Sequence, residues 1–216
     1  MPIKDYPFSF EVEGPMAMFA SHPDSGSERS TSLVPTPTAI KGMAESILFL
    51  RHAEVIPVKA HICAPIRTYE AGYNYRYGPL VKSYKNAVQE RMTVLGRVVY
   101  QLFCVARDAK ERTGKHRTTK SEPYFDKVNS GHSYQEQFER RLKSGNFYRD
   151  VCLGRKTCHT TYVGPLREST KTEDINMTIP FLLKNFFTEP TFGVPNFKNT
   201  TVYRNIEIKN GVIVYV

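Results

Sequence analysis

The residues best suited to acid–base chemistry are three polar side chains near the middle of the chain. Lys115 and His116 are adjacent in a basic stretch, and His132 lies just ahead of a predicted helix. A lysine can stabilise the charge of a phosphorane, and an imidazole can transfer a proton near neutral pH. Each histidine can equally be an ordinary surface residue. The sequence has no paired carboxylates, nucleophile elbow or phosphate-binding glycine loop.

Aromatic and cationic side chains are interleaved along residues 67–91, between two predicted strands. Tyrosine rings stack on unpaired bases and cations bind phosphates, so this mixture is typical of a surface that binds single-stranded nucleic acid. The alternative is a long hairpin whose tyrosines pack on one another and whose charges are merely solvated. The residues concerned are Arg67, Tyr69, Tyr73, Tyr75, Arg76, Tyr77, Lys82, Tyr84, Lys85 and Arg91.

The positive charge of the protein is concentrated in and after this segment. The net charge is +9 at pH 7, and residues 67–120 contain twelve lysines and arginines against four acids, or 12 − 4 = +8. A charge needed only for solubility would be scattered, whereas this concentration favours a polyanionic partner.

A shorter basic and aromatic stretch lies at the end of a second predicted helix. Arg140, Arg141 and Lys143 occupy its last turn, and Phe147, Tyr148 and Arg149 follow. Cations also complement the dipole at a helix C-terminus, so dipole stabilisation and nucleic-acid contact are equal alternatives here.

Composition excludes several other classes of protein. With 40% apolar and 12% aromatic residues, the chain can form a packed core. No apolar run approaches the roughly 20 residues that span a bilayer. The N-terminus also lacks a secretory signal, so we expect a cytoplasmic protein without membrane contact. The four cysteines form no Cys-x-x-Cys pair, and Cys152 with Cys158-His159 matches no structural zinc pattern. We therefore expect reduced thiols, no metal and no cofactor.

Hydrophobic periodicity predicts strands and helices in a mixed order. Strands are predicted at 8–12, 55–66 and 93–106, and later ones near 157–163 and 202–208. A first helix is predicted with Thr38 as its N-cap, and a second over 134–143 that Gly145 closes. Asn210-Gly211 predicts a type I′ hairpin turn. The second strand is predicted to place five residues on one face: Ile56, Val58, Ala60, Ile62 and Ala64.

This order favours an α+β fold in a single domain over residues 1–216, with a ferredoxin-like split β-α-β body. Residues at about 65–92 would form a protruding basic, tyrosine-rich β-hairpin arm, and residues at about 107–133 a basic loop. The chain would end in a C-terminal β-hairpin. Such a fold hosts many functions and decides none.

Five segments carry a family resemblance in the right order: Val34 to Ile47, Gln89 to Gln101, Phe138 to Gly145, Cys152 to Lys156, and Asn210 to Ile213. Together they resemble the CRISPR-associated Cas-five family of the RAMP superfamily, particularly its type I-C branch. The resemblance implies an RRM- or RAMP-type body whose arm meets RNA or a neighbouring subunit. It also implies a Cascade subunit that holds the 5′ handle of CRISPR RNA (crRNA), contacts the backbone and large subunits, and lies near the recognition motif of target DNA.

The candidate RNA-binding residues combine the basic and aromatic segments with cations of the family-like segments. They are Lys41, Arg67, Tyr69, Tyr73, Tyr75, Arg76, Tyr77, Lys82, Tyr84, Lys85, Arg91, Arg140, Arg141, Lys143, Arg155 and Lys156.

The type I-C branch is also similar to a metal-independent endoribonuclease that cuts precursor crRNA with a tyrosine, a lysine and a histidine. The tyrosine belongs at the end of the first helix, where this chain has Leu48. The Lys-His pair belongs just before the second helix, where His132 precedes Tyr134. Lys115-His116 supplies a literal pair, but seventeen residues, 117–133, separate it from Tyr134.

Three hypotheses therefore stay open. The first is a non-catalytic RNA-binding subunit, which Leu48 favours. The second is a processing endoribonuclease that uses Lys115, His116 or His132. The third is a basic protein-interaction module without RNA contact.

Overall fold

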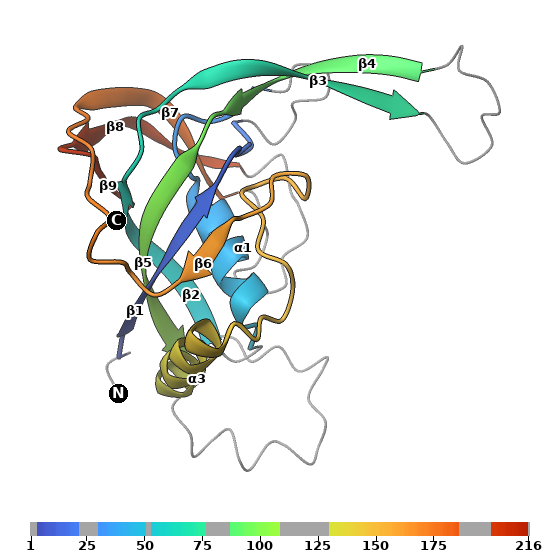
Figure 1. Cartoon of the computed structure of the whole chain (residues 1–216). Coiled ribbons are helices and arrows are strands. Elements are labelled where there is room, and N and C mark those ends of the chain that lie inside the picture. Colours follow the sequence, from blue (N-terminus) through green and yellow to red (C-terminus); the bar gives the residue numbers. More distant parts are fainter. Residues whose placement is uncertain are drawn as a thin grey trace.

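A computed structural model describes residues 4–21, 30–50, 53–76, 87–108, 130–185 and 200–215 (Figure 1). Within the ladder at 73–76 and 87–90 it describes the backbone alone. Tyr77, Lys82, Tyr84, Lys85, Lys115 and His116, which the sequence singles out, lie outside the described residues.

Within the described residues, seven strands form one sheet in the order β6-β1-β5-β2-β9-β8-β7 (Figure 1). All the paired neighbours are antiparallel. The alternation that predicts a strand at 8–12 is confirmed, because this segment lies inside β1. The strands are β1 (Tyr6–Gly14), β2 (Ala53–Ile62), β5 (Val98–Asp108), β6 (Tyr162–Gly164), β7 (Met177–Asn185), β8 (Thr201–Lys209) and β9 (Val212–Val214).

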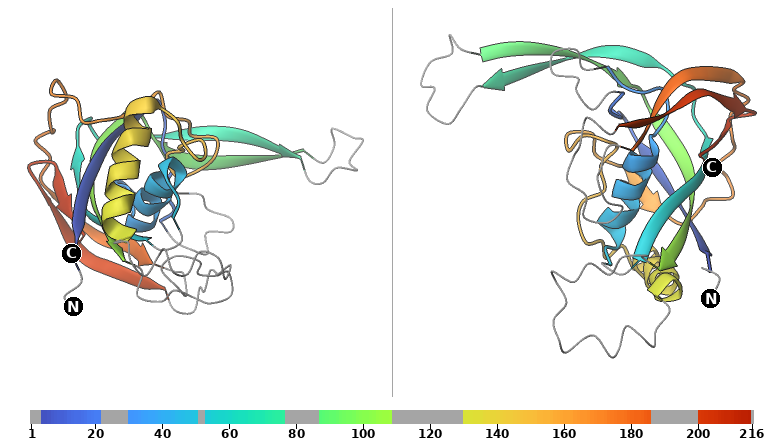
Figure 2. Two further views of the ribbon diagram at one scale, coloured as in Figure 1. Left: turned by 90° about the horizontal axis from the view of Figure 1, so that it is seen from below. Right: turned by 180° about the vertical axis from the view of Figure 1, so that it is seen from behind.

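Helices α1 (Pro37–Ile47) and α3 (Ser130–Ser144) pack on one face of the sheet (Figure 2). Aromatic rings fill the space under α3, where Phe138 lies 4.5 Å from Phe8 and 5.5 Å from Phe10 between ring centroids. Tyr134 joins the two helices, because its buried hydroxyl donates a hydrogen bond of 2.9 Å to the Leu48 carbonyl at the end of α1. This bond satisfies a carbonyl that the helix itself leaves without a partner.

Helix α1 begins earlier than the sequence predicts. Thr36, and not Thr38, is the N-cap, and its hydroxyl accepts a hydrogen bond of 3.3 Å from the Ala39 N–H. Pro37 explains the shift, since proline suits the first helical position and fixes the backbone there. The predicted end of the second helix is confirmed, because Gly145 has φ +68° directly after Ser144.

A β-bulge alters the predicted face of β2. The register with β5 shifts between Pro57 and Lys59, so Val58 is an extra residue that reverses the alternation. Ala60 and Ile62 are buried as predicted, but Ile56 and Val58 are only half-buried. The buried residue of the first half is instead Val55.

The strand predicted over 93–106 is divided into two at Gly96-Arg97. Its first part belongs to β4 (Ala87–Leu95), which pairs with β3 (Thr68–Arg76) in a separate two-stranded ladder, while its last residue also bridges to Ala17. This ladder extends away from the main sheet (Figure 1). Gly96 permits the break, because a Cβ at this position would lie 2.8 Å from the Tyr69 ring.

The C-terminal half also differs from the prediction. Of the strand predicted near 157–163, the structure has only β6 and an isolated bridge between Cys152 and His159. Strand β7, which closes the far edge of the sheet, was not predicted. The type I′ turn between β8 and β9 is confirmed, because Asn210 and Gly211 have φ values of 49° and 72°.

A buried carboxylate connects β1 to the chain that covers the other face of the sheet. Glu11 is fully buried and accepts hydrogen bonds from the Arg167 N–H (3.0 Å) and Nε (2.6 Å), from Thr170 (2.8 Å) and from Gln101 (3.1 Å). Arg167 also reaches Glu13 at 2.7 Å. Burial alone would raise the pKa of Glu11, but these hydrogen bonds outweigh it and keep the pKa below its ordinary value.

We predict that Glu11→Gln lowers the free energy of unfolding by about 2 kcal/mol, because it weakens the charge-assisted hydrogen bonds that Arg167 donates to the buried carboxylate, although Arg167 keeps its bond to Glu13. The pKa of Glu11 is lower in the folded than in the unfolded state. Wild-type stability from this group is therefore present above about pH 4 and is lost as the pH falls below it, whereas the variant loses less over that range. Denaturant titration between pH 3 and 7 measures both effects. The control Glu207→Gln, which changes an exposed pair with Lys209, should leave stability unchanged. Equal effects of the two substitutions would contradict this account.

Candidate nucleic-acid interface

A cavity of about 640 Å³ lies where the β3–β4 ladder leaves the sheet, on the face away from the helices. Arg67, Tyr69 and Arg97 line it together with Cys63 and Glu173. Tyr69 is 46% exposed, and its hydroxyl donates to the Pro15 carbonyl at 3.4 Å. The ring is therefore held at its hydroxyl end while part of its surface stays accessible. A stacking ring beside guanidinium groups can accept a base and its phosphate.

Arg97 is a residue of this cavity that the sequence did not single out. Its side chain is 79% exposed and lies 3.4 Å from a Glu13 carboxylate oxygen. The sequence did contain a signal for this position. Gly96 interrupts the predicted strand directly before Arg97, and glycine inside a strand often marks a bend. At the break the Gly96 N–H donates to the Arg67 carbonyl at 2.8 Å, and Arg97 lines the same cavity as Arg67 instead of lying within a continuous strand.

The ladder positions the remaining tyrosines of the segment by its backbone pairing. Tyr73 is in register with Glu90 and Tyr75 with Val88, while Arg76 pairs with Ala87. Arg91 lies opposite Gly72, and its side chain is exposed.

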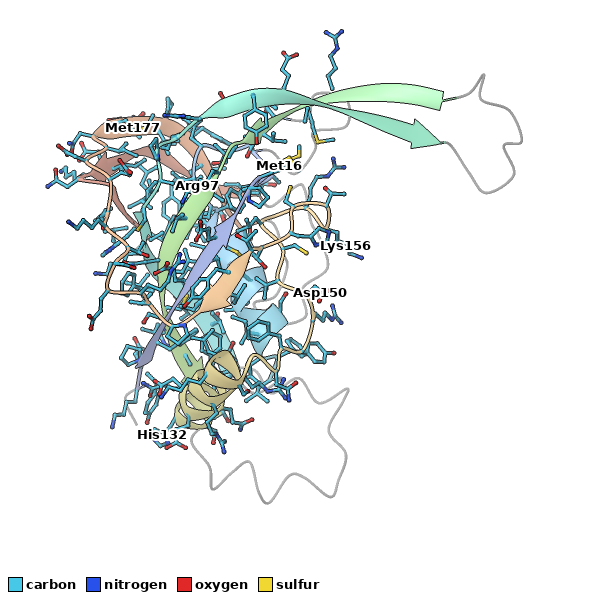
Figure 3. The ribbon with its side chains drawn as sticks, in the orientation of Figure 1. Met16, Arg97, His132, Asp150, Lys156 and Met177 are labelled. Carbon is cyan, nitrogen blue, oxygen red and sulfur yellow. The ribbon has the colours of Figure 1, made fainter. Side chains whose placement is uncertain are left out.

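A loop on the helix side of the ladder brings two more of the predicted cations to its base. Arg155 Nη1 lies 3.7 Å from the Met92 sulfur of β4 and 4.0 Å from that of Met18. Lys156, the next residue, is exposed and points outward on the side over which the ladder extends (Figure 3). The family-like segment 152–156 and the predicted arm therefore meet, although they are far apart in the sequence.

The geometry of Gly154 fixes this loop. Gly154 has φ +90°, and a Cβ there would lie 1.9 Å from the Met18 carbonyl oxygen. The Leu153 carbonyl also accepts a hydrogen bond of 2.9 Å from the Met18 N–H. Because the backbones of the loop and residue 18 touch, the position of Arg155 is set by packing and not by a free loop.

The other predicted cations lie on the helices. Arg140 and Lys143 are exposed near the end of α3, and Arg141 is half-buried. Lys143 shares a second cavity, of about 590 Å³, with Glu139 and Leu142. Lys41 lies on α1, where its ammonium group is 3.9 Å from Glu45, so it is not part of the group at the base of the ladder.

His132 is the candidate catalytic residue that the structure describes. It lies in the first turn of α3, with its ring 5.4 Å from the Tyr6 ring and its Nε2 3.6 Å from a Glu136 oxygen. Leu48, at the position where the family resemblance expects a tyrosine, is buried in the core. The hydroxyl that reaches this end of α1 is instead that of buried Tyr134, and burial holds its pKa well above the ordinary value. It is thus poorly suited to act as a base.

The described ranges contain no cluster of potential metal ligands and no candidate transmembrane helix. All four cysteines are free thiols, and no group of three potential metal ligands comes together in this part of the chain. None of the helices described here is long and apolar enough to cross a membrane.

Comparison with known families decides the affiliation. Residues 9–180 match the family model described as CRISPR-associated protein (Cas_Cas5). The chain belongs to this family. A search of curated proteins found no match.

Solved structures share the fold of this Cas_Cas5 chain at low sequence identity. One, described as a CRISPR-associated protein, is 21% identical with a TM-score of 0.72, covering 100% of this chain and 95% of its own. A functionally uncharacterized protein from Streptococcus mutans is 16% identical with a TM-score of 0.69, covering 98% and 92%. A chain of a CRISPR RNA-guided surveillance complex is 13% identical with a TM-score of 0.50, covering 97% and 90%.

The family-like segments of the sequence serve mainly to build this fold. They contain the Thr36 cap of α1 and three glycines with positive φ, at positions 145, 154 and 211. Such positions constrain the backbone, so they identify the family through its architecture. They say less about which side chains contact a ligand.

We predict that Gly154→Ala strongly destabilises the protein and displaces Arg155 and Lys156, because the new methyl group collides with the Met18 backbone. Gly42→Ala is the matched control, since nothing lies within 4 Å of a Cβ at that exposed position of α1. It should stabilise the protein by up to about 1 kcal/mol. Thermal unfolding of the three proteins tests both expectations. A Gly154→Ala protein as stable as the wild type would contradict the described loop geometry.

Proposed function

We propose that this protein is an RNA-binding subunit of a CRISPR effector complex of the Cascade type. In this role it holds the 5′ handle of crRNA, caps the backbone of the complex and lies near target DNA. Membership of the Cas_Cas5 family is the observation that carries the proposal. The fold shared with a chain of a CRISPR RNA-guided surveillance complex supports it.

We further propose that β1, α1, β2, β5, α3 and β6 form a ferredoxin-like body and that the β3–β4 ladder is its arm. The strand order β6-β1-β5-β2 supports this, because α1 connects β1 to β2 and α3 connects β5 to β6. The arm would then meet RNA or the adjacent backbone subunit.

The cations at the base of the arm are suited to binding RNA. Arg67 and Arg97 line one cavity with the accessible Tyr69 ring, and Arg155 lies against Met92 of β4 with Lys156 next to it in the chain. Cations near an aromatic ring can bind phosphates while the ring stacks on a base. A protein partner that fits the same surface would have to be strongly acidic.

We predict that purified protein binds a single-stranded CRISPR repeat RNA with steep salt dependence. Reversing Arg155 and Lys156 to glutamate should weaken binding at least tenfold and reduce the salt slope by about 1.4, since each lost phosphate contact lowers the slope by roughly 0.7. The matched control reverses Lys171 and Lys209, two exposed lysines that are not among the candidate RNA-binding residues. Titrations at several KCl concentrations provide the measurement. Binding without salt dependence, or equal losses in both double variants, would instead support a protein-interaction module.

A processing endoribonuclease is the second candidate function. The observation that favours it is that the described residues on either side of the segment 109–129 meet next to His132 in the chain. Asp108, before the segment, accepts a hydrogen bond of 3.0 Å from the Gly131 N–H after it. The buried Leu48 opposes this function, because it supplies no hydroxyl.

We predict that the protein leaves an end-labelled repeat RNA intact in EDTA, as seen on a denaturing gel. A binding titration on the same RNA shows that the protein sample is active. A single specific cut that disappears in Lys115→Ala, His116→Ala or His132→Ala would overturn this expectation. It would make the protein a metal-independent nuclease in which the hydroxyl at position 48 is dispensable.

A further inference from the structure

An aromatic pair lies on the surface at the end of α1. Tyr148 stacks on Phe49 with a centroid distance of 6.1 Å and an interplanar angle of 23°. Tyr148 is 52% exposed, while Phe49 is half-buried and supports it from below. About half of Tyr148 is therefore accessible, and an accessible aromatic ring is what an unpaired base stacks on.

The backbone holds this pair in place. The Tyr148 N–H donates to the Ile47 carbonyl at 3.2 Å, and the Arg149 N–H donates to the Ser46 carbonyl at 2.8 Å. These bonds satisfy carbonyls in the last turn of α1, which the helix leaves open. The exposed ring therefore stands on a fixed support and loses little conformational freedom when it binds.

One cation lies beside the pair, and others precede and follow it along the chain. The Arg149 guanidinium lies 5.0 Å from the centroid of the Tyr148 ring. Residues 140–156 contain six lysines and arginines and a single acid, Asp150. This run continues from α3 past Tyr148 to Arg155 and Lys156 at the base of the arm, so phosphates can be bound on either side of the ring.

We propose that Phe49, Tyr148 and Arg149 form a stacking site for an unpaired RNA base, separate from the base of the arm. The inference rests on the proposed RNA-binding function and adds a second contact to it. The Tyr148 ring stacks on the base, Phe49 supports the ring, and Arg149 binds the adjoining phosphate. The local excess of cations favours RNA over a protein partner.

The test uses the full chain and a single-stranded repeat RNA in which 2-aminopurine replaces single bases in turn. At one position the wild type should quench the fluorophore. Tyr148→Ala should abolish this quenching and weaken binding about tenfold, while Tyr148→Trp should retain both. Arg149→Ala should lower the salt slope by about 0.7. The control Phe181→Ala removes another exposed aromatic ring, on β7, and should change neither the quenching nor the affinity for RNA. Thermal unfolding identifies variants that fail to fold.

The other outcomes show whether the stacking site, the proposed RNA-binding function or both are wrong. If the Arg155 and Lys156 reversal weakens RNA binding but Tyr148→Ala does not, the stacking site is wrong and the RNA-binding function stands. The stacking contact is also wrong if Tyr148→Ala weakens binding just as much on an RNA that has an abasic nucleotide at the quenched position as on the intact RNA. If the wild type binds no RNA, both proposals fail. If Tyr148→Ala instead abolishes association with another subunit, the pair is a protein contact.

Discussion

The buried Glu11 carboxylate is the constraint on which the rest of the structure depends. Strand β1 alternates between the aromatic core under α3 and the opposite face, where Glu11 meets Arg167 and Gln101. A slip of one residue would move this charge into the aromatic core, so the pairing of β1 with β5 has a single acceptable register. That register fixes where β5 starts. Because β4 directly precedes β5 in the chain, the register also fixes where the β3–β4 ladder leaves the sheet. Glu13, two residues further on, reaches both Arg167 and Arg97 at that point.

The base of the ladder brings together side chains from distant parts of the chain. Packing of Tyr69 against Gly96 determines one side, and the backbone contact of Gly154 with residue 18 determines the other. The cations there are thus held by rigid neighbours, while their charged ends stay accessible. This combination supports a preformed surface for RNA, in contrast to a flexible basic tail.

The sequence predicted the elements whose signals are local. The alternation in β1, the helical spacing of α1 and α3, and the Asn210-Gly211 turn all depend on neighbouring residues, and each is present. The bulge at Val58 and the break at Gly96 depend on distant contacts, so periodicity alone could not predict them. The same holds for the site. The basic, tyrosine-rich segment pointed to Arg67 and the family-like segment 152–156 to Arg155, but only packing shows that Arg155 lies against Met92 of β4. Lys41 was included as a cation of a family-like segment, and the structure places it in an ion pair with Glu45.

Cross-linking of crRNA to the assembled effector complex, followed by mass spectrometry of the attached peptides, tests the central claim most directly. The account predicts adducts between the 5′ end of the RNA and peptides that contain Tyr69, Arg155 or Tyr148. The contradictory result is a complex in which these peptides cross-link only to other protein subunits while the RNA end attaches elsewhere. The protein would then be an interaction module within the complex.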